Sequence, residues 1–152
     1  MKTLSLFALA LTLFCTTASA QVRAQKHKTS TRQQAVAVHR VVMQLSSADT
    51  LEHKGLMNNL KHLKEGWGDS VQVEVVVHGP GIALLTKGKS TQEEAIRQMI
   101  QKGVQFVVCA NTMKQKGITS EQLLPDVGVV PMGIGEIIKK QEQGWTYIKA
   151  GF

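Results

Sequence analysis

Val104-Gln105-Phe106-Val107-Val108-Cys109-Ala110-Asn111-Thr112-Met113 is the stretch of sequence that decides the fold. Its first five residues are rich in β-branched and aromatic side chains, are too few for a helix, and predict a buried strand. The capping residues Asn111 and Thr112 then predict a helix, which Gly117 ends. We therefore expect Cys109 at the point where a strand gives way to a helix.

A cysteine at such a turn has two interpretations. Open α/β sheets bind ligands beyond the carboxyl ends of their strands, and a helix N-terminus favours a thiolate over a thiol. Free cysteine is also a common buried residue that behaves as a small apolar side chain. The residues around Cys109 leave a reactive and an inert thiol equally open.

The rest of the chain alternates between apolar runs and amphipathic stretches. These stretches are separated by glycines and by two capping boxes, one at Asp49 and Glu52 and the other at Ser90 and Glu93. The alternation predicts a three-layer α/β/α domain with a mostly parallel five-stranded sheet whose last strand lies at an edge. The remaining expected strands cover 36–45, 71–77, 127–130 and 145–148, and the remaining long helices cover about 49–65, 90–103 and 134–144.

The first 20 residues have the pattern of a secretory signal peptide. Lys2 precedes an apolar run over 4–14, and Ala18-Ser19-Ala20 is a small-residue cleavage site. A lipoprotein signal that uses Cys15 is the alternative, although Phe14 stands where a small residue is expected. The pattern predicts a periplasmic or secreted protein, and no other stretch is long and apolar enough to form a transmembrane segment.

Residues 21–35 read as a basic flexible arm that precedes the domain expected over 36–152. Five of the 18 Lys and Arg residues lie between 21 and 40, where there is no acid, so the domain itself is close to neutral. A domain that binds nucleic acid carries a basic stripe with base-reading residues, and none is present, so no nucleic-acid partner is expected. The arm is either a solvated tail or a tether to an anionic surface.

Signal cleavage would leave Cys109 as the single cysteine of the mature chain. An intramolecular disulfide is then impossible, and an intermolecular pair, a reactive thiol or a buried inert thiol remains.

Nucleotide-binding motifs are incomplete. Gly88-Lys89-Ser90 resembles the end of a phosphate-binding loop, but Ala83 stands where that motif has glycine. Gly133-Ile134-Gly135 begins a dinucleotide fingerprint that Ile138 breaks, and a helix start accounts for it better. No nucleotide or other cofactor is predicted.

The histidines have no metal-ligand spacing, so no metal is expected. His78 alone stands at the carboxyl end of a strand, on the rim predicted for Cys109. It is either a turn residue bonded to the backbone of Gly79-Pro80-Gly81 or a catalytic residue. The other four are His27, His39, His53 and His62.

Three blocks of sequence, in this order and spacing, resemble the DsrE/DsrF-like family of small α/β proteins. They are VVVHGPG at 75–81, GVQFVVCANTM at 103–113, and 129–149, which opens with VVPMG and closes with EQGWTYIK. The resemblance covers about residues 39–149 and implies a flavodoxin-like fold and homo-oligomers such as trimers or hexamers. It also implies that Cys109 occupies the position of the cysteine that carries sulfur as a persulfide in relay members, with a sulfur compound or a donor or acceptor protein as its partner.

Two functional hypotheses follow. The first is an exported sulfur carrier or sulfurtransferase in which Cys109 is the nucleophile, Asn111 and the backbone of Gly79 and Gly81 line the pocket, and His78 transfers a proton. The second is a homo-oligomeric binding module for a small ligand or a protein, with Cys109 buried and inert.

Overall fold

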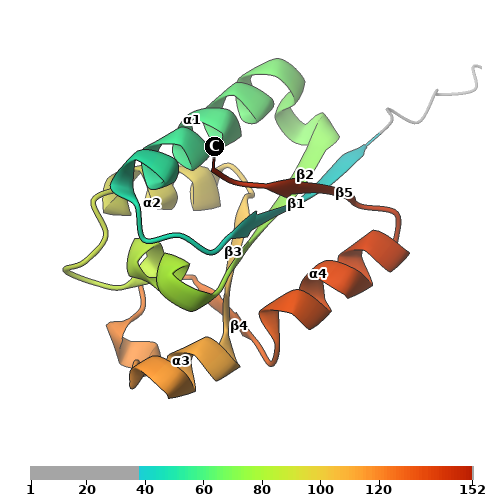
Figure 1. Ribbon diagram of the computed structural model, residues 1–152. Helices are drawn as coiled ribbons and strands as arrows, with labels where there is room; N and C mark the ends of the chain where they lie inside the picture. Colours follow the sequence, from blue (N-terminus) through green and yellow to red (C-terminus); the bar gives the residue numbers. More distant parts are fainter. Residues whose placement is uncertain (1–37, 152) are drawn as a thin grey trace, which may run out of the picture. The chain divides into compact units, whose positions relative to one another are not determined.

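The structure is a computed structural model that describes residues 38–151, so the expected signal peptide and basic arm lie outside the described residues (Figure 1). The described chain alternates strands with helices along its length. In chain order the elements are β1 (His39–Leu45), α1 (Thr50–Trp67), η1 (Gly68–Ser70), β2 (Val71–Val77), η2 (Gly79–Leu85), α2 (Glu93–Gln101), β3 (Gln105–Cys109), α3 (Ala110–Lys116), η3 (Ser120–Gln122), β4 (Gly128–Val130), α4 (Gly133–Glu142) and β5 (Thr146–Lys149).

The strands form one parallel sheet in the order β4-β3-β2-β1-β5. The register aligns Leu45 with Val77, and it aligns Cys109 with Val130. The carboxyl ends of β1 to β4 therefore meet at one edge of the sheet. The predicted α/β class, the five strands and the edge position of the last strand are confirmed.

The order of the strands puts the helices on two faces. The chain moves from β1 to β4 in one direction across the sheet, then returns past all of these strands to place β5 beyond β1. Parallel crossovers are right-handed, so reversing the direction moves the connecting helix to the opposite face. Accordingly α1, α2 and α3 pack on one face and α4 on the other, which gives the three predicted layers (Figure 1).

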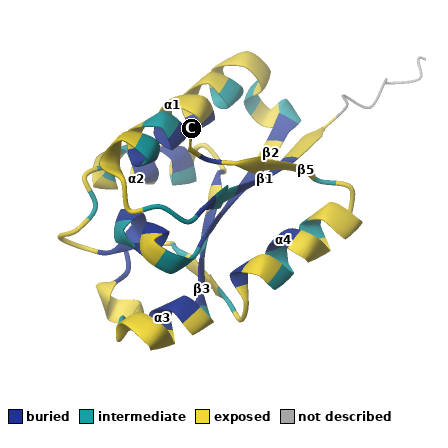
Figure 2. Ribbon diagram, in the orientation of Figure 1, coloured by how far each residue is buried: buried dark blue, intermediate teal, exposed yellow. Residues whose placement is uncertain are grey.

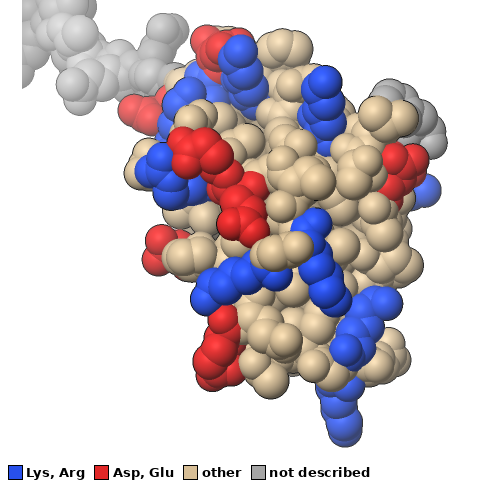
Figure 3. Space-filling view, turned by 90° about the vertical axis from the view of Figure 1, so that its left-hand side faces the viewer, with Lys and Arg blue, Asp and Glu red and all other residues tan. Residues whose placement is uncertain are grey.

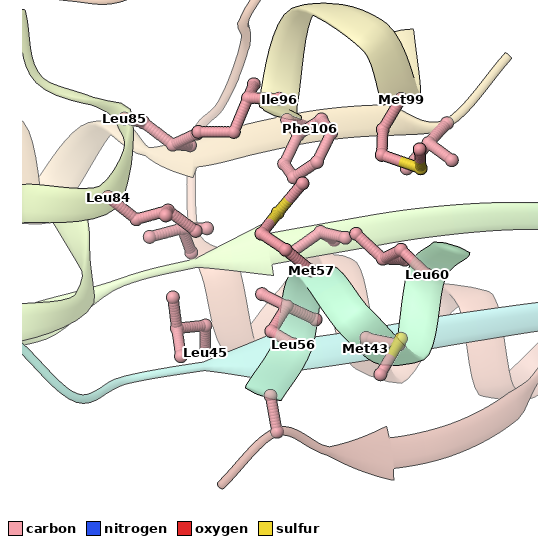
Figure 4. Packing of buried hydrophobic residues seen from close by; sticks show 14 of the residues in the cluster. Met43, Leu45, Leu56, Met57, Leu60, Leu84, Leu85, Ile96, Met99 and Phe106 are labelled. Atoms are coloured by element: carbon pink, nitrogen blue, oxygen red, sulfur yellow. The ribbon is translucent and has the colours of Figure 1, made fainter. Parts of the chain in front are cut away.

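The face under α1 and α2 carries most of the core. Alternate residues of the strands point into it, because side chains of a strand alternate between faces. Phe106 of β3, Met57 of α1 and Ile96 of α2 all belong to this cluster, and Figure 4 draws the side chains as they meet there. Burying one such side chain contributes about 1.5–3 kcal/mol.

The face under α4 carries a much smaller apolar cluster. Its buried members are Val42, Val76 and Ile137, with Val107 and Trp145 packed against them. The outer side of α4 and all of β5 are exposed (Figure 2). A single helix with few buried apolar residues therefore covers the face to which Cys109 belongs.

Some local predictions were wrong. Ser90 and Glu93 do not form a capping box: Ser90 accepts from the N–H of Gln92, and Glu93 accepts from the N–H of Gly88. The first helix continues past Gly66 to Trp67, and its C-cap is Gly68, whose φ of 52° favours glycine. Leu51 and Trp67 recur at helical spacing with Leu56, Leu60 and Leu63, which predicts that they are buried, but both are exposed.

The surface shows no single-sign patch on the side drawn in Figure 3. Acidic and basic side chains are interspersed on this face, and several of them lie side by side. Among residues 38–151, no helix combines the length and the apolar character that crossing a membrane requires.

Candidate functional site

Cys109 lies at the one position in the sheet where neighbouring strands lead to opposite faces. After β3 the chain continues into α3 on the main core side, and after the adjacent β4 it continues into α4 on the other side. The two connections diverge at the carboxyl ends of these two strands, which is the position where open α/β sheets bind ligands. Cys109 ends β3 and Gly133 begins α4, so both residues lie at this position.

The Cys109 thiol is almost buried, with 6% of the residue exposed. Burial raises the pKa of the thiol, but the backbone N–H groups of Gly133, Thr112 and Asn111 and the Thr112 hydroxyl favour the thiolate, and the net effect is a pKa below the ordinary value. N–H groups at the N-termini of both α3 and α4 therefore contribute to the same shift.

The start of α3 corrects the predicted cap. The helix begins at Ala110, and Cys109 is the N-cap residue with extended backbone angles. Asn111 thus lies inside the first turn with an exposed side chain, and only its N–H acts on the thiol. Thr112 is buried, and its hydroxyl both acts on the thiol and accepts a hydrogen bond from Gly79.

Gly133 brings α4 into direct contact with the site. A Cβ at this position would lie 3.2 Å from Cβ of Cys109, 3.3 Å from Cβ of His78 and 3.5 Å from Cγ1 of Val76. The backbone fixes the Cβ atoms of Cys109 and His78, so these two atoms cannot rotate away. Only glycine lets the first turn of α4 approach the thiol this closely.

Thr112 ties the turn after β2 to α3. Its Oγ1 accepts a hydrogen bond from the N–H of Gly79, with a donor–acceptor distance of 3.0 Å. Gly79 has a φ of 55°, which a residue with a side chain adopts at a cost. The bond holds His78, the preceding residue, on the same rim as Cys109.

Gly81 has a different role from the one predicted. A Cβ there would lie 2.7 Å from the carbonyl oxygen of Leu45, at the end of β1. Gly81 therefore allows the turn to pack against the end of β1, and its contacts are with that strand.

Gln44 joins His78 to Tyr147. The Tyr147 hydroxyl donates to Oε1 of Gln44, and Nε2 of Gln44 lies 2.6 Å from Nε2 of His78. Because the Gln44 oxygen accepts from the phenol, its amide nitrogen faces the imidazole and donates. Nε2 of His78 is then an acceptor and the proton sits on Nδ1. Burial also lowers the pKa of His78 below 6.5, which agrees with a neutral ring.

A sequence model of the DsrE/DsrF-like family matches residues 30–150. The chain belongs to this family. No match was found among curated proteins.

Solved structures similar to this DsrE/DsrF-like chain include a protein of unknown function, MTH1491 from Methanobacterium thermoautotrophicum. It has 32% identity and a TM-score of 0.70, and the match covers 73% of this chain and 98% of that one. BT1422 from Bacteroides thetaiotaomicron, also of unknown function, has 16% identity and a TM-score of 0.59 and covers 72% and 93%. The E. coli protein ychN has 8% identity and a TM-score of 0.59 and covers 74% and 98%. The last two support the DsrE-like fold alone.

In the structure of this family member, all of the predicted site residues except Gly81 lie close together. Cys109, His78 and the backbone of Asn111 and Gly79 lie on one rim, whereas Gly81 contacts the end of β1. The sequence prediction missed four further residues of the site: Gln44, Thr112, Gly133 and Tyr147. The one available signal was that Gly133 follows the expected strand at 127–130 within three residues.

Two clefts of the described surface lie away from Cys109. One of about 570 Å³ lies between α2 and residues 124–126, and one of about 320 Å³ lies between α1 and Ile148 of β5. Within residues 38–151, no group of three or more His, Cys, Asp or Glu side chains is arranged to hold a metal ion.

Proposed function

We propose that this protein is a sulfur carrier or sulfurtransferase that holds sulfane sulfur as a persulfide on Cys109. The lowered pKa of the thiol supports the proposal most directly, because persulfide exchange begins with a thiolate. Membership of the DsrE/DsrF-like family, with its sulfur-relay-type fold, agrees with it.

The proposed reaction has two exchange steps. The Cys109 thiolate attacks the outer sulfur of a donor persulfide, a new S–S bond forms at Cys109, and the donor S–S bond breaks and releases the donor thiolate with its electron pair. An acceptor thiolate then attacks the outer sulfur of the Cys109 persulfide, which returns Cys109 to its thiolate. No net oxidation or reduction takes place.

His78 has a defined part in this scheme. Its Nε2 accepts from Gln44, so its Nδ1–H is a donor that remains available for a sulfur anion near Cys109. The contact of Gly133 with both His78 and Cys109 places the two residues beside each other. His78 therefore acts as a neutral hydrogen-bond donor, and the cation is disfavoured by burial.

The test is the intact mass of the purified protein after exposure to polysulfide, for the wild-type chain and for Cys109→Ser. The proposal predicts a gain of about one sulfur mass that a reductant reverses and that Cys109→Ser lacks. Release of the sulfur as thiocyanate by cyanide checks that it is sulfane sulfur. A folded wild-type protein that gains no sulfur, and whose thiol resists a small alkylating reagent until unfolded, contradicts the proposal.

The low exposure of Cys109 favours one alternative, a binding module in which the thiol is inert. Alkylation of the native protein separates the two functions. A reactive thiol is modified in the folded state, whereas an inert one is modified only at the rate of unfolding.

We also propose that the protein is exported and periplasmic or secreted. The proposal is supported by the signal-peptide pattern of residues 1–20. Expression of the full chain is then expected to give a product that begins at Gln21 in the exported fraction. A product with an intact N-terminus that stays with the cytoplasm contradicts export.

Homo-oligomer formation, as a trimer or hexamer, is the last part of the proposal. Three large apolar residues in α4 and just before it are about half exposed, which favours a protein contact there. Sedimentation of the wild-type protein is expected to give a multiple of the monomer mass. A charged residue in place of Ile138 is expected to lower this mass. A monomeric wild-type protein contradicts the proposal. The three residues are Met132, Ile134 and Ile138.

A further inference from the structure

An ion pair lies buried under α4. Glu74, in the middle of β2, is 4% exposed, and its Oε2 lies 2.6 Å from Nζ of Lys140 on α4. Its other oxygen, Oε1, is buried without a hydrogen-bond partner in the described structure. A buried carboxylate is tolerated when it is paired with an opposite charge. The attraction between Glu74 and Lys140 therefore holds this part of α4 at one position on the sheet.

Lys140 is itself held from several sides. The ring of Trp145 lies 4.4 Å from its Nζ, and Oε1 of Glu136 lies 3.9 Å from it. The side chain of Lys140 is 15% exposed. The ammonium group is therefore fixed between the sheet and its own helix.

The spacing along helix and strand makes this pair a second attachment point for α4. Lys140 follows Gly133 by seven residues, about 10 Å along a helix. Glu74 precedes Val76 on the same face of β2 by about 7 Å, and it precedes His78, which follows the end of the strand, by about 13 Å. Gly133 contacts Val76 and His78 at one end, and Lys140 binds Glu74 at the other.

Little else fixes α4 along the sheet. Between the two attachment points Ile137 is the one buried apolar side chain of α4, and it packs with Val42 and Val76. Apolar contacts of this kind resist separation but allow sliding, whereas a short ion pair sets a position.

We propose that Glu74 and Lys140 are positioning residues for Cys109, which fix α4 along the sheet so that the N–H of Gly133 stays against the sulfur. The inference rests on the proposed use of Cys109 as a nucleophile. Neither residue touches the thiol, and both act through α4. His78, Glu136 and the N-terminus of α3 also face this region and remain unchanged in the test below.

The test uses the full chain with Cys15→Ser, so that Cys109 is the only thiol. The variant is the double substitution Glu74→Gln with Lys140→Met, which removes both charges and leaves no unpaired buried ion. The control is Lys139→Met, the neighbouring lysine, whose side chain is 65% exposed. The readouts are the pH dependence of alkylation and the ultraviolet absorbance of the thiolate, with circular dichroism to check the fold.

The double variant is expected to titrate its thiol at higher pH than the parent chain, and Lys139→Met is expected to match the parent. At pH values below the midpoint of the titration, losing the interaction with one helix N-terminus lowers the fraction of thiolate about fivefold. A more basic thiolate is more nucleophilic, so the alkylation rate falls by only about twofold.

Two results overturn the inference in different ways. In the first, the parent thiol titrates at a lower pH in the folded than in the unfolded protein, and the folded double variant titrates at the same pH as the parent. The ion pair then does not position α4, but the proposed function survives. In the second, the thiol of the folded parent titrates at the same pH as in the unfolded protein or at a higher one, and both the inference and the proposed function fail.

Glu74→Asp keeps the inference testable if the double variant does not fold. It retains the charge but shortens the side chain by one methylene, so it draws Lys140 toward β2. A thiol that still titrates with the parent overturns the inference, and an upward shift supports it.

Discussion

Replacing Gly133 with alanine tests the close contact between α4 and the thiol. The new Cβ would lie 3.2 Å from Cβ of Cys109 and 3.3 Å from Cβ of His78, so α4 must move by a few tenths of an ångström. Overpacking of this kind costs about 1–3 kcal/mol. The better helix propensity of alanine returns up to about 1 kcal/mol. We expect a net loss of about 1 kcal/mol and a fall in Tm of about 4 °C.

The same displacement also moves the Gly133 N–H away from Cys109. We therefore expect the pH profile of alkylation to shift upward in Gly133→Ala, because the thiolate loses one of its partners. Thermal unfolding and the alkylation profile, measured on the same preparation, give the two readouts.

Gly135→Ala is the matched control, two residues along the same helix. Its new Cβ would meet Cε of Met132 at 2.5 Å, but this is the free end of a side chain that is 54% exposed and can rotate away. We expect this variant to gain about 0.5–1 kcal/mol from helix propensity and to keep the thiol profile. Gly133→Ala with the stability and thiol profile of Gly135→Ala would refute the close contact.

Three further predictions concern the rim. Thr112→Val removes the acceptor for the Gly79 N–H, so we expect a loss of about 1–3 kcal/mol in denaturant unfolding and a higher thiol pKa; Thr86→Val, which loses a buried bond elsewhere, is expected to lower stability alone. Tyr147→Phe removes the hydroxyl that orients the Gln44 amide, so this amide can turn its oxygen toward the ring of His78. We then expect the pKa of His78, measured by NMR, to rise. An unchanged titration contradicts the assigned tautomer. Finally, burial holds the folded pKa of His78 below 6.5, so the unfolded state binds more protons and stability is expected to fall as pH drops below about 6.5; equal pH dependence of Tm in His78→Asn would count against this.

The sequence predicted the fold well because its strongest signals are local. The apolar run at 104–108 and the glycines that follow the helices depend on neighbours within a few residues, and strand and helix assignment needs little more. Membership of the family also followed from blocks of adjacent residues.

The site was harder to predict because its contacts join distant residues. Cys109 meets Gly133 only because β4 lies beside β3, and Gln44 meets Tyr147 only because β5 crosses to the far edge. Glu74 alternates with apolar residues at the start of β2, a pattern that predicts a solvent-facing side chain, but it is buried against Lys140. His53 has polar neighbours on α1, which predict an exposed position, but it is buried and its Nε2 bonds the carbonyl of Ser47.

The return of the chain from β4 to β5 has a consequence for the order of folding. The units that run from β1 to α3 join neighbouring strands, so their contacts close short loops, whereas α4 and β5 must cross three strands before they pair with β1. Contacts that close long loops form late. A growing chain therefore completes the main core first and leaves Cys109 uncovered until its last twenty residues dock. During that interval the thiol is open to any oxidant or disulfide in its surroundings, and the final docking step is also the step that ends its exposure.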